Sequence, residues 1–302
     1  SVDVVGVGVD IVDGSIVVCP DSDIEEINLA ASFYGIASTT SYAVESITYE
    51  PPFPFTGGTQ TSVDTDDVWS DAIDLPFNFC FFGESFTQAK VGSNGVVQFG
   101  NGMTDGGGCP WAFTQSVPNP AFPILNAIYG VYQDIDPFIN NAFASPNINY
   151  QVLGTYPCRA LVVNFSQVAQ FGTGCNNSAA VGAQTSQIVI YEISNIIEVY
   201  VERRVPCTSW QNGVGVIGIQ NALGTVGYTP PGRNTGAWSA TEEAWRFLPN
   251  GESDVDFQWL MNGGFYSNQN DISIVLTPEQ QLELETNLTL TLEMEAIATY
   301  AT

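Results

Sequence analysis

Closely spaced carboxylates are the residues of this chain whose types and spacing could do chemistry. Asp64, Asp66 and Asp67 are nearly consecutive, and one residue separates Asp134 from Asp136. Paired carboxylates carry the chemistry of glycosidases, and Asp134 and Asp136 would lie about 7 Å apart on one face of an extended strand. The same pattern is also typical of turns. The chain has no histidine, which excludes Ser-His-Asp and Cys-His catalysis, and we expect no catalytic residues.

Binding of a metal cation is a second use for the same carboxylates. Hard oxygen ligands suit Ca²⁺, whereas the lack of histidine excludes zinc sites built on that residue. The candidate ligands are Asp64, Asp66, Asp134 and Asp136. Calcium is the one cofactor for which candidate ligands are found. The alternative, a solvated acidic loop, leaves the chain without any cofactor.

The charge balance excludes several classes of partner. The 302 residues include 32 acidic and 6 basic side chains, for a formal net charge of −26. Such a chain repels the phosphates of nucleic acids and the surface of anionic membranes. No apolar run reaches the roughly 20 residues that span a bilayer, so no membrane insertion is expected. With 44% hydrophobic residues, the chain is nevertheless able to bury a core.

Six cysteines, none of them in a Cys-x-x-Cys pair, indicate an oxidising compartment. An even number of cysteines without metal-binding companions is typical of disulfides in secreted proteins. We predict up to three disulfides, in a connectivity that the sequence leaves open, among Cys19, Cys80, Cys109, Cys158, Cys175 and Cys207. Free thiols in a cytosolic protein are the alternative.

Short apolar segments separated by turn residues fill the middle of the chain. Gly and Asn separate them at intervals of about ten residues, the spacing expected of a β-sandwich. The segments predicted as strands are 75–83, 91–99, 160–165, 187–191, 196–201 and 214–220. Few helix signals accompany them, so the predicted fold class is all-β.

The N-terminal segment combines a strand pattern with a helix signal. The alternating apolar residues are Val5, Val7, Val9 and Ile11. A tight turn at 13–14 follows them, which predicts a β-hairpin over residues 5–18. Residues 22–25 then match a capping box, which predicts a short helix ended by Gly35.

The C-terminal segment alternates in the same way over residues 288–300. Its apolar face begins with Leu288, Leu290, Leu292 and Met294. A strand with one apolar face pairs within its own domain or, at an exposed sheet edge, with another chain. The two terminal segments are therefore interpreted either as internal strands or as strands that pair between copies in a polymer.

Arginine dominates the few basic residues, with five arginines against one lysine. Arginine binds carboxylates through two parallel hydrogen bonds, which a lysine cannot do. We therefore predict structural ion pairs, such as Arg246 with a nearby glutamate. Recognition of sugars or carboxylates is the alternative.

Several motifs resemble a known family. FNFCFFG at 77–83 and VGSNG at 91–95 are similar to the core of nidogen-type extracellular domains. QDIDP at 133–137, PGRNTG at 231–236 and EAWRF at 243–247 are similar to a nidogen-like module of type IX-secreted, gliding-associated surface proteins of Bacteroidota. The resemblance covers about residues 40–250.

The terminal patterns and the resemblance together predict three segments. Residues 1–40 would be an N-terminal hairpin and acidic segment able to donate a strand, and 41–250 a nidogen-like or jelly-roll-like β-sandwich. Residues 251–302 would form an immunoglobulin-like or PKD-like unit, the kind of repeat that follows the module in relatives. That unit would lack its last strands, and the N-terminal hairpin of a neighbouring copy would complete it.

Together these expectations describe a protein without catalysis. The chain is expected to be secreted to a bacterial cell surface as the structural subunit of an extracellular filament. Copies of the chain would join head to tail by strand pairing, a contact that does not close. The alternative is a carbohydrate-binding adhesin module of a larger gliding-associated protein. In that case Trp111, Trp210 and Trp238 would stack on surface glycans rather than fill the core.

Overall fold

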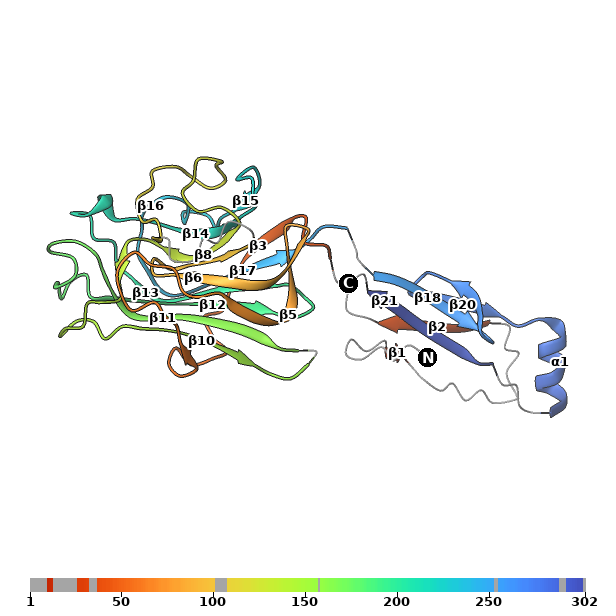
Figure 1. Ribbon diagram of the computed structural model, residues 1–302. Coiled ribbons are helices and arrows are strands. Elements are labelled where there is room, and N and C mark those ends of the chain that lie inside the picture. Colours follow the sequence, from red (N-terminus) through yellow and green to blue (C-terminus); the bar gives the residue numbers. More distant parts are fainter. Residues whose placement is uncertain are drawn as a thin grey trace. The chain divides into compact units, whose positions relative to one another are not determined.

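The computed structural model describes residues 10–12, 26–32, 37–100, 108–156, 158–252, 255–287 and 292–300 (Figure 1). The chain divides into two compact units. The central unit is Ser38–Gly251, and the terminal unit joins Ser1–Ala37 to Glu252–Thr302. Among the described residues, no helix is both long and apolar enough to cross a membrane.

The central unit contains two antiparallel sheets (Figure 1). Within the described residues, the larger sheet has the order β3 (Tyr42–Ile47), β17 (Ala240–Pro249), β13 (Ile197–Arg204), β12 (Ala183–Tyr191), β11 (Ala160–Gln170), β10 (Asn147–Leu153) and β4 (Thr59–Gln60). The short strand β9 (Ile135–Asp136) also pairs with β11. Every pairing in this sheet is antiparallel.

The second sheet of the central unit is likewise antiparallel. Over the described chain its order is β15 (Gly227–Tyr228), β14 (Val214–Gln220), β8 (Ala127–Tyr132), β7 (Val96–Phe99), β6 (Glu84–Gly92) and β5 (Ile73–Phe81). The strand β16 (Gly236–Ala237) pairs with β14, and the 3-10 turn η1 (Gln211–Gly213) precedes β14.

Alternation along β5 shows why these segments form strands. Ile73, Leu75, Phe77, Phe79 and Phe81 are buried, whereas the residues between them are exposed or half-buried. Successive side chains of a strand point to opposite faces, so this period of two places all five on the core side. Strands β11 and β12 are buried on both faces because aromatic residues of the loop after β3 cover their outer side.

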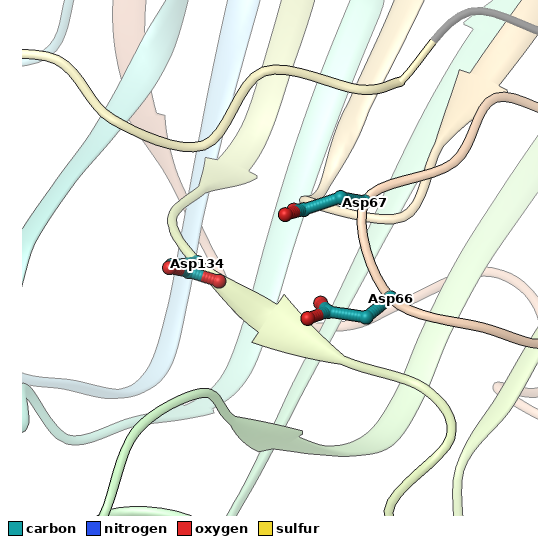
Figure 2. A group of neighbouring side chains, drawn as sticks. All are labelled: Asp66, Asp67 and Asp134. Atoms are coloured by element: carbon teal, nitrogen blue, oxygen red, sulfur yellow. The ribbon is translucent and has the colours of Figure 1, made fainter.

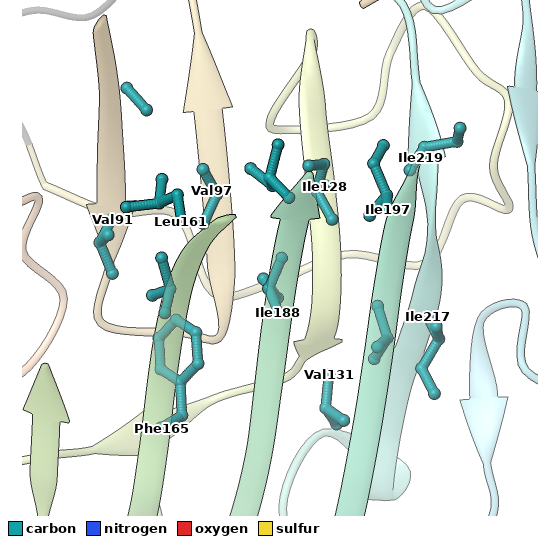
Figure 3. Close-up of a cluster of buried hydrophobic side chains, with 14 of the residues drawn as sticks. Val91, Val97, Ile128, Val131, Leu161, Phe165, Ile188, Ile197, Ile217 and Ile219 are labelled. Atoms are coloured by element: carbon teal, nitrogen blue, oxygen red, sulfur yellow. The ribbon is translucent and has the colours of Figure 1, made fainter. Parts of the chain in front are cut away.

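One apolar core lies between the two sheets of the central unit. Figure 3 shows Leu161, Phe165, Ile188 and Ile197 of the larger sheet among side chains of the second sheet. The labelled partners from the second sheet are Val91, Val97, Ile128, Val131, Ile217 and Ile219. All of these side chains are at most 3% exposed. The central unit is therefore a β-sandwich, as predicted.

The terminal unit has two three-stranded sheets in its described residues. One sheet is β1 (Asp10–Val12), β2 (Glu26–Ser32) and β20 (Asp271–Val275), and the other is β19 (Gly264–Ser267), β18 (Val255–Met261) and β21 (Met294–Tyr300). They share a core in which Ala31, Ile272 and Ile274 meet Phe257 and Trp259. The α-helix α1 (Pro278–Asn287) connects β20 toward β21. Both units are thus all-β in their cores.

Most predicted strands of the middle are confirmed, but the predicted strand 91–99 is wrong, because residues 93–95 form a turn between β6 and β7. The predicted helix near residue 27 is also wrong. Residues 160–165, 187–191 and 214–220 lie within β11, β12 and β14. Residues 26–32 form β2 instead of a helix. The reason is the period-two pattern of Ile27, Leu29 and Ala31, which pack against the core around Trp259. Burial in that core outweighs the local capping signal.

The structure places only some of the predicted assembly residues. Val5, Val7, Val9, Leu288 and Leu290 lie outside the described residues, as does Cys19. Ile11 is in β1 and pairs with Ala31 of its own chain. Leu292 and Met294 are half-buried against the terminal-unit core, so their apolar face is covered within the unit.

Candidate functional site

A turn of the VGSNG motif holds together the two segments that carry the candidate acids. The Ser93 hydroxyl accepts a hydrogen bond from the Val68 backbone N–H at 3.1 Å. The Asn94 side chain donates to Asp67 Oδ1 at 2.9 Å and accepts from the Ile135 backbone N–H at 3.0 Å. Gly95 has φ +83°, and a Cβ there would lie 2.1 Å from the Val131 carbonyl oxygen, so only glycine fits.

Asp66, Asp67 and Asp134 form the candidate site. One carboxylate oxygen of each can be chosen so that all three lie within 4.8 Å of one another. Figure 2 shows Asp66 and Asp67, from the loop before the bridge at Val68, facing Asp134 from the segment between β8 and β9. Three like charges are thus gathered from segments far apart in the sequence.

Two oxygens of this cluster are buried without a hydrogen bond. Asp134 is 7% exposed; its Oδ2 accepts from the Trp210 indole N–H at 2.7 Å, while its Oδ1 has no hydrogen-bond partner. Asp66 Oδ1 is also buried without a partner. Buried polar atoms are almost always hydrogen-bonded, so such atoms indicate a missing partner.

Burial and mutual repulsion raise the pKa values of the cluster. Desolvation, and then the charges of Asp136, Asp67 and Asp134, raise the pKa of Asp66 to about 7. Desolvation is also the main cause that raises the pKa of Asp134 to about 6, with Asp67 and Asp136 adding to it. The pKa values of Asp67 and Asp136 are raised for the same primary reason. Full ionisation of the three carboxylates is therefore unfavourable unless a cation neutralises part of their charge.

In metal-free buffer, the stability of the central unit is expected to decrease as the pH rises from about 4 to about 7. A carboxyl group whose pKa is higher in the folded chain takes up a proton on folding, so its contribution to stability is lost as the pH rises through that interval. The interval runs from the ordinary value of 3.8 to about 7 for Asp66 and about 6 for Asp134.

The measurement is the midpoint of thermal unfolding across this pH range, compared with the double variant Asp66→Asn, Asp134→Asn. The variant should lose part of the slope, because two of the raised pKa values are gone. An identical slope in both proteins would contradict the prediction.

Comparison with known protein families identifies the family of the chain. A family model described as NIDO related matches residues 41–257, most of the chain. The chain belongs to the NIDO-related family. No curated protein and no solved structure matches it. The central unit, together with the start of β18, is therefore the NIDO-related domain, an all-β module of a non-catalytic type.

The NIDO-related domain brings together two of the four predicted metal ligands, with a third nearby. Asp66 and Asp134 are in the cluster, and Asp136 is close enough to raise the pKa of Asp66. Asp64 is exposed and lies outside the cluster. Asp67 was not among the predicted ligands. Only its position next to Asp66 could have suggested it, because the tether that turns it inward comes from Asn94, 27 residues away.

The tryptophans of the NIDO-related domain serve different purposes. Trp210 is half-buried, and its ring packs against Phe171 at 5.0 Å and Trp111 at 5.9 Å between centroids. Trp238 is 8% exposed, and its indole N–H donates to the Gly215 carbonyl at 3.0 Å. Trp238 is thus a core residue, whereas Trp111 and Trp210 form an aromatic surface beside Asp134.

One disulfide is formed among the described cysteines, between Cys175 and Cys207. The wider prediction is wrong for Cys109 and Cys158, which are free thiols. Cys109 is buried, and a Cβ at Gly92 would lie 2.6 Å from its sulfur, so it fills a core position; burial raises its thiol pKa to about 12. Cys158 is exposed in the turn after β10, and Cys80 is half-buried on β5.

Removing the disulfide with Cys175→Ser and Cys207→Ser should lower the free energy of unfolding by about 3–4 kcal/mol. The bond joins residues with a sequence separation of 32, and closing a loop of that length lowers the conformational entropy of the unfolded chain, which is worth about 3–4 kcal/mol of stability. Denaturant unfolding of the variant and of the wild type, each with and without reductant, measures it. Reductant should destabilise only the wild type, and equal losses in both would contradict the prediction.

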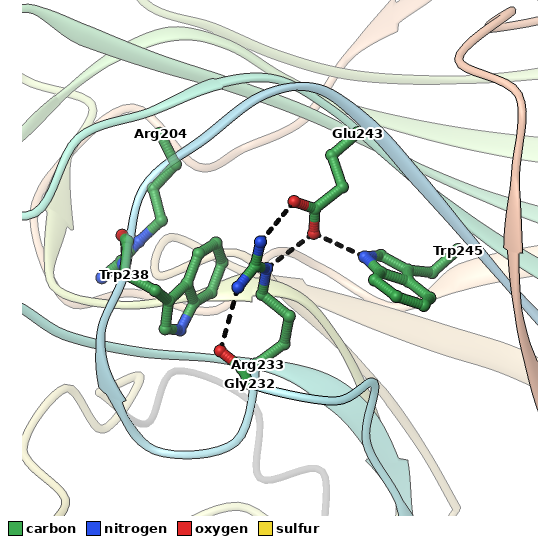
Figure 4. Close-up of polar contacts among 6 residues, drawn as sticks. All are labelled: Arg204, Gly232, Arg233, Trp238, Glu243 and Trp245. Atoms are coloured by element: carbon green, nitrogen blue, oxygen red, sulfur yellow. Dashed lines mark hydrogen bonds and ion pairs between the residues drawn. The ribbon is translucent and has the colours of Figure 1, made fainter.

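The predicted arginine pairs are confirmed in the NIDO-related domain. Arg246 donates from Nε and Nη2 to Glu198 Oε1 at 2.8 and 2.6 Å. Arg233 binds both oxygens of Glu243, which also accepts from the Trp245 indole at 2.5 Å (Figure 4). Residues of the PGRNTG and EAWRF motifs are thus structural partners.

The last strand of the terminal unit has an unpaired edge within the described residues. β21 pairs with β18 along Met294–Tyr300, and no other described strand pairs with it. Its apolar residues Met294 and Ala296 face the core. Further pairing at this strand would therefore use the backbone groups of its outer edge and not its apolar face.

Proposed function

We propose that the chain is a secreted, non-enzymatic structural subunit of an extracellular filament at a bacterial cell surface. The observation that carries the proposal is the outer edge of β21, which pairs with no described strand and is a template for a strand from another copy. Domains of the NIDO-like kind are often extracellular, which agrees with this location. The motifs shared with gliding-associated proteins support export by the type IX route.

The donor in this proposal is the N-terminal segment with Val5, Val7 and Val9, which precedes β1, where Ile11 pairs with Ala31 of its own chain. Its alternating pattern suits an added strand with one apolar face, as in other cases of strand addition. The added strand would complete a terminal unit of immunoglobulin-like or PKD-like type. Because donor and acceptor are different segments, the contact repeats head to tail without closing. The net charge of −26 opposes this contact until salt screens it.

Electron microscopy of the purified chain at increasing ionic strength tests the proposal. The wild type should form filaments of regular repeat, and the variant Val7→Lys, Val9→Lys should remain monomeric. A matched control is Val152→Lys, at a 38% exposed position of β10 in the central unit, which should form filaments normally. Monomers under every condition, or filaments of the Val7→Lys, Val9→Lys variant, would overturn strand donation.

A second candidate function is a carbohydrate-binding adhesin module of a larger gliding-associated protein. The surface of Trp111 and Trp210, with the 72% exposed Phe138 close in sequence to Asp134, favours this candidate because sugars stack on aromatic rings. A glycan array distinguishes the two functions. Binding that is lost in Trp111→Ala would favour the adhesin, whereas the filament proposal expects no glycan binding.

A further inference from the structure

Two buried carboxylate oxygens of the acidic cluster need a hydrogen-bond donor or a cation, and no described side chain supplies one. Asp134 Oδ1 and Asp66 Oδ1 are both buried without a hydrogen bond. One carboxylate oxygen from each of Asp66, Asp67 and Asp134 lies within 4.8 Å of the other two. Arg159, Arg233 and Arg246 form ion pairs with carboxylates outside the cluster, namely Glu192, Glu243 and Glu198. Leaving such carboxylates unpaired is costly, so a positively charged partner fits this position best.

The geometry matches a hard divalent cation. Two oxygens that share one Ca²⁺ at about 2.4 Å can lie at most about 4.8 Å apart, and the three oxygens satisfy this limit. Ca²⁺ accepts irregular sets of oxygen ligands from loops, whereas Mg²⁺ usually keeps several waters in strict octahedral geometry. The nearby carboxylate of Asp136 adds further negative charge.

We propose that Asp66, Asp67 and Asp134 together bind one Ca²⁺ ion in the NIDO-related domain. This inference goes beyond the filament proposal and does not depend on it. The ion would bridge the segment before Val68 to the segment between β8 and β9.

Neighbouring residues hold the ligands in place before an ion arrives. The Trp210 indole holds Asp134 Oδ2 by a hydrogen bond, while Oδ1 stays buried and without a hydrogen-bond partner. Asn94 fixes Asp67 Oδ1 and the backbone of Ile135. Such outer hydrogen bonds orient ligands and increase metal affinity. Asn94 is fully buried, so these supports belong to the rigid sandwich rather than to mobile side chains.

Calcium titration of the EDTA-treated, dialysed full chain by calorimetry tests the proposal. The wild type should bind one ion, with Mg²⁺ at least tenfold weaker. Asp134→Asn and Asp66→Asn should each weaken Ca²⁺ binding at least tenfold. The matched control Asp64→Asn, an exposed acid two positions from Asp66, should bind as the wild type does. Absence of binding in the wild type, equal binding by Asp134→Asn, or an equal loss in Asp64→Asn would overturn the proposal.

Two further measurements separate binding from folding. The Tb³⁺ ion replaces Ca²⁺, and excitation of a nearby tryptophan makes it luminesce, so Trp210→Phe should lose most of this signal while a Trp238→Phe control should keep it. In metal-free buffer, Asp66→Asn should raise the midpoint of thermal unfolding because repulsion is relieved, yet it should abolish the further rise caused by Ca²⁺ in the wild type. A calcium-induced rise retained by Asp66→Asn would contradict the proposed ligand set.

Discussion

Replacing Arg204 by leucine is expected to lower the free energy of unfolding of the NIDO-related domain by about 3–5 kcal/mol. Arg204 is 1% exposed and donates to Gln133 Oε1 at 2.9 Å, to the Gly213 carbonyl at 2.8 Å and to the Trp238 carbonyl. Leucine replaces the apolar stem but leaves the Gly213 and Trp238 carbonyls without this donor, at a cost of about 1–3 kcal/mol each, and Gln133 Oε1 keeps only the donor Gln170 at 3.4 Å.

The aromatic partner of Arg204 adds to this loss. Its guanidinium carbon lies 4.0 Å from the centre of the Trp238 ring, and the guanidinium of Arg233 lies 4.9 Å from the same ring (Figure 4). Burial, and then the charge of Arg233, lower the pKa of Arg204 to about 9, which still leaves it charged at neutral pH. Loss of a buried cation–π contact therefore accompanies loss of the hydrogen bonds.

Denaturant unfolding of Arg204→Leu measures the effect as a lower midpoint at an unchanged slope. The control is Arg203→Leu, the adjacent arginine, which is half-buried and donates to the carbonyls of Val181 and Ala183, groups that water can reach after substitution. We expect the control to cost about 1 kcal/mol. Equal losses in the two variants would show that burial of Arg204 is not the cause.

Replacing Trp259 by alanine is expected to unfold the terminal unit while the NIDO-related domain stays folded. Trp259 is fully buried, packs edge-on against Phe257 and donates from its indole to the Gln269 carbonyl at 2.9 Å. Such a substitution costs about 3–5 kcal/mol. The described core of this unit is small, so that cost approaches the whole stability of a unit of this size.

Calorimetry of Trp259→Ala should show the loss of one unfolding transition and an unchanged second one. Phe265→Ala removes an aromatic side chain that is 67% exposed on β19 of the same unit, and it should leave both transitions in place. A parallel shift of both transitions in Trp259→Ala would mean that the two units unfold as one.

Local patterns predicted the strands that bury one face, and they failed where distant residues decide the structure. The alternation of β5 is visible in residues 73–81, and the structure confirms it. The capping box before residue 26 is a local helix signal, and it predicted a helix. That prediction failed because residues 26–30 pair with β20, a strand far away in the sequence that no local pattern reveals. The pairing of Cys175 with Cys207 was likewise left open, because both cysteines lie in loops that only the sandwich brings together.

The sequence predicted that carboxylates form the candidate site, but it did not predict which aspartates lie together. Asp66 and Asp134 were predicted as candidate oxygen ligands from their carboxylate chemistry, their spacing and, for Asp134, the resemblance of the QDIDP motif. Asp67 lies in the cluster and Asp64 does not. Asp67 has a φ of +54° and accepts a hydrogen bond from Asn94, and these two features place its side chain in the cluster. Neither feature has a local signal in the sequence, because the turn that carries Asn94 follows another strand.

The discontinuous composition of the terminal unit has a consequence for the order of events on the ribosome. Glu26 of β2 and its hydrogen-bond partner Ser273 of β20 are 247 positions apart, and the NIDO-related domain lies between them in the chain. During synthesis the whole sandwich emerges before β20, so β2 lacks this pairing partner until the last part of the chain has been made. The sheet of β1, β2 and β20 can therefore be completed only after the NIDO-related domain has been synthesised.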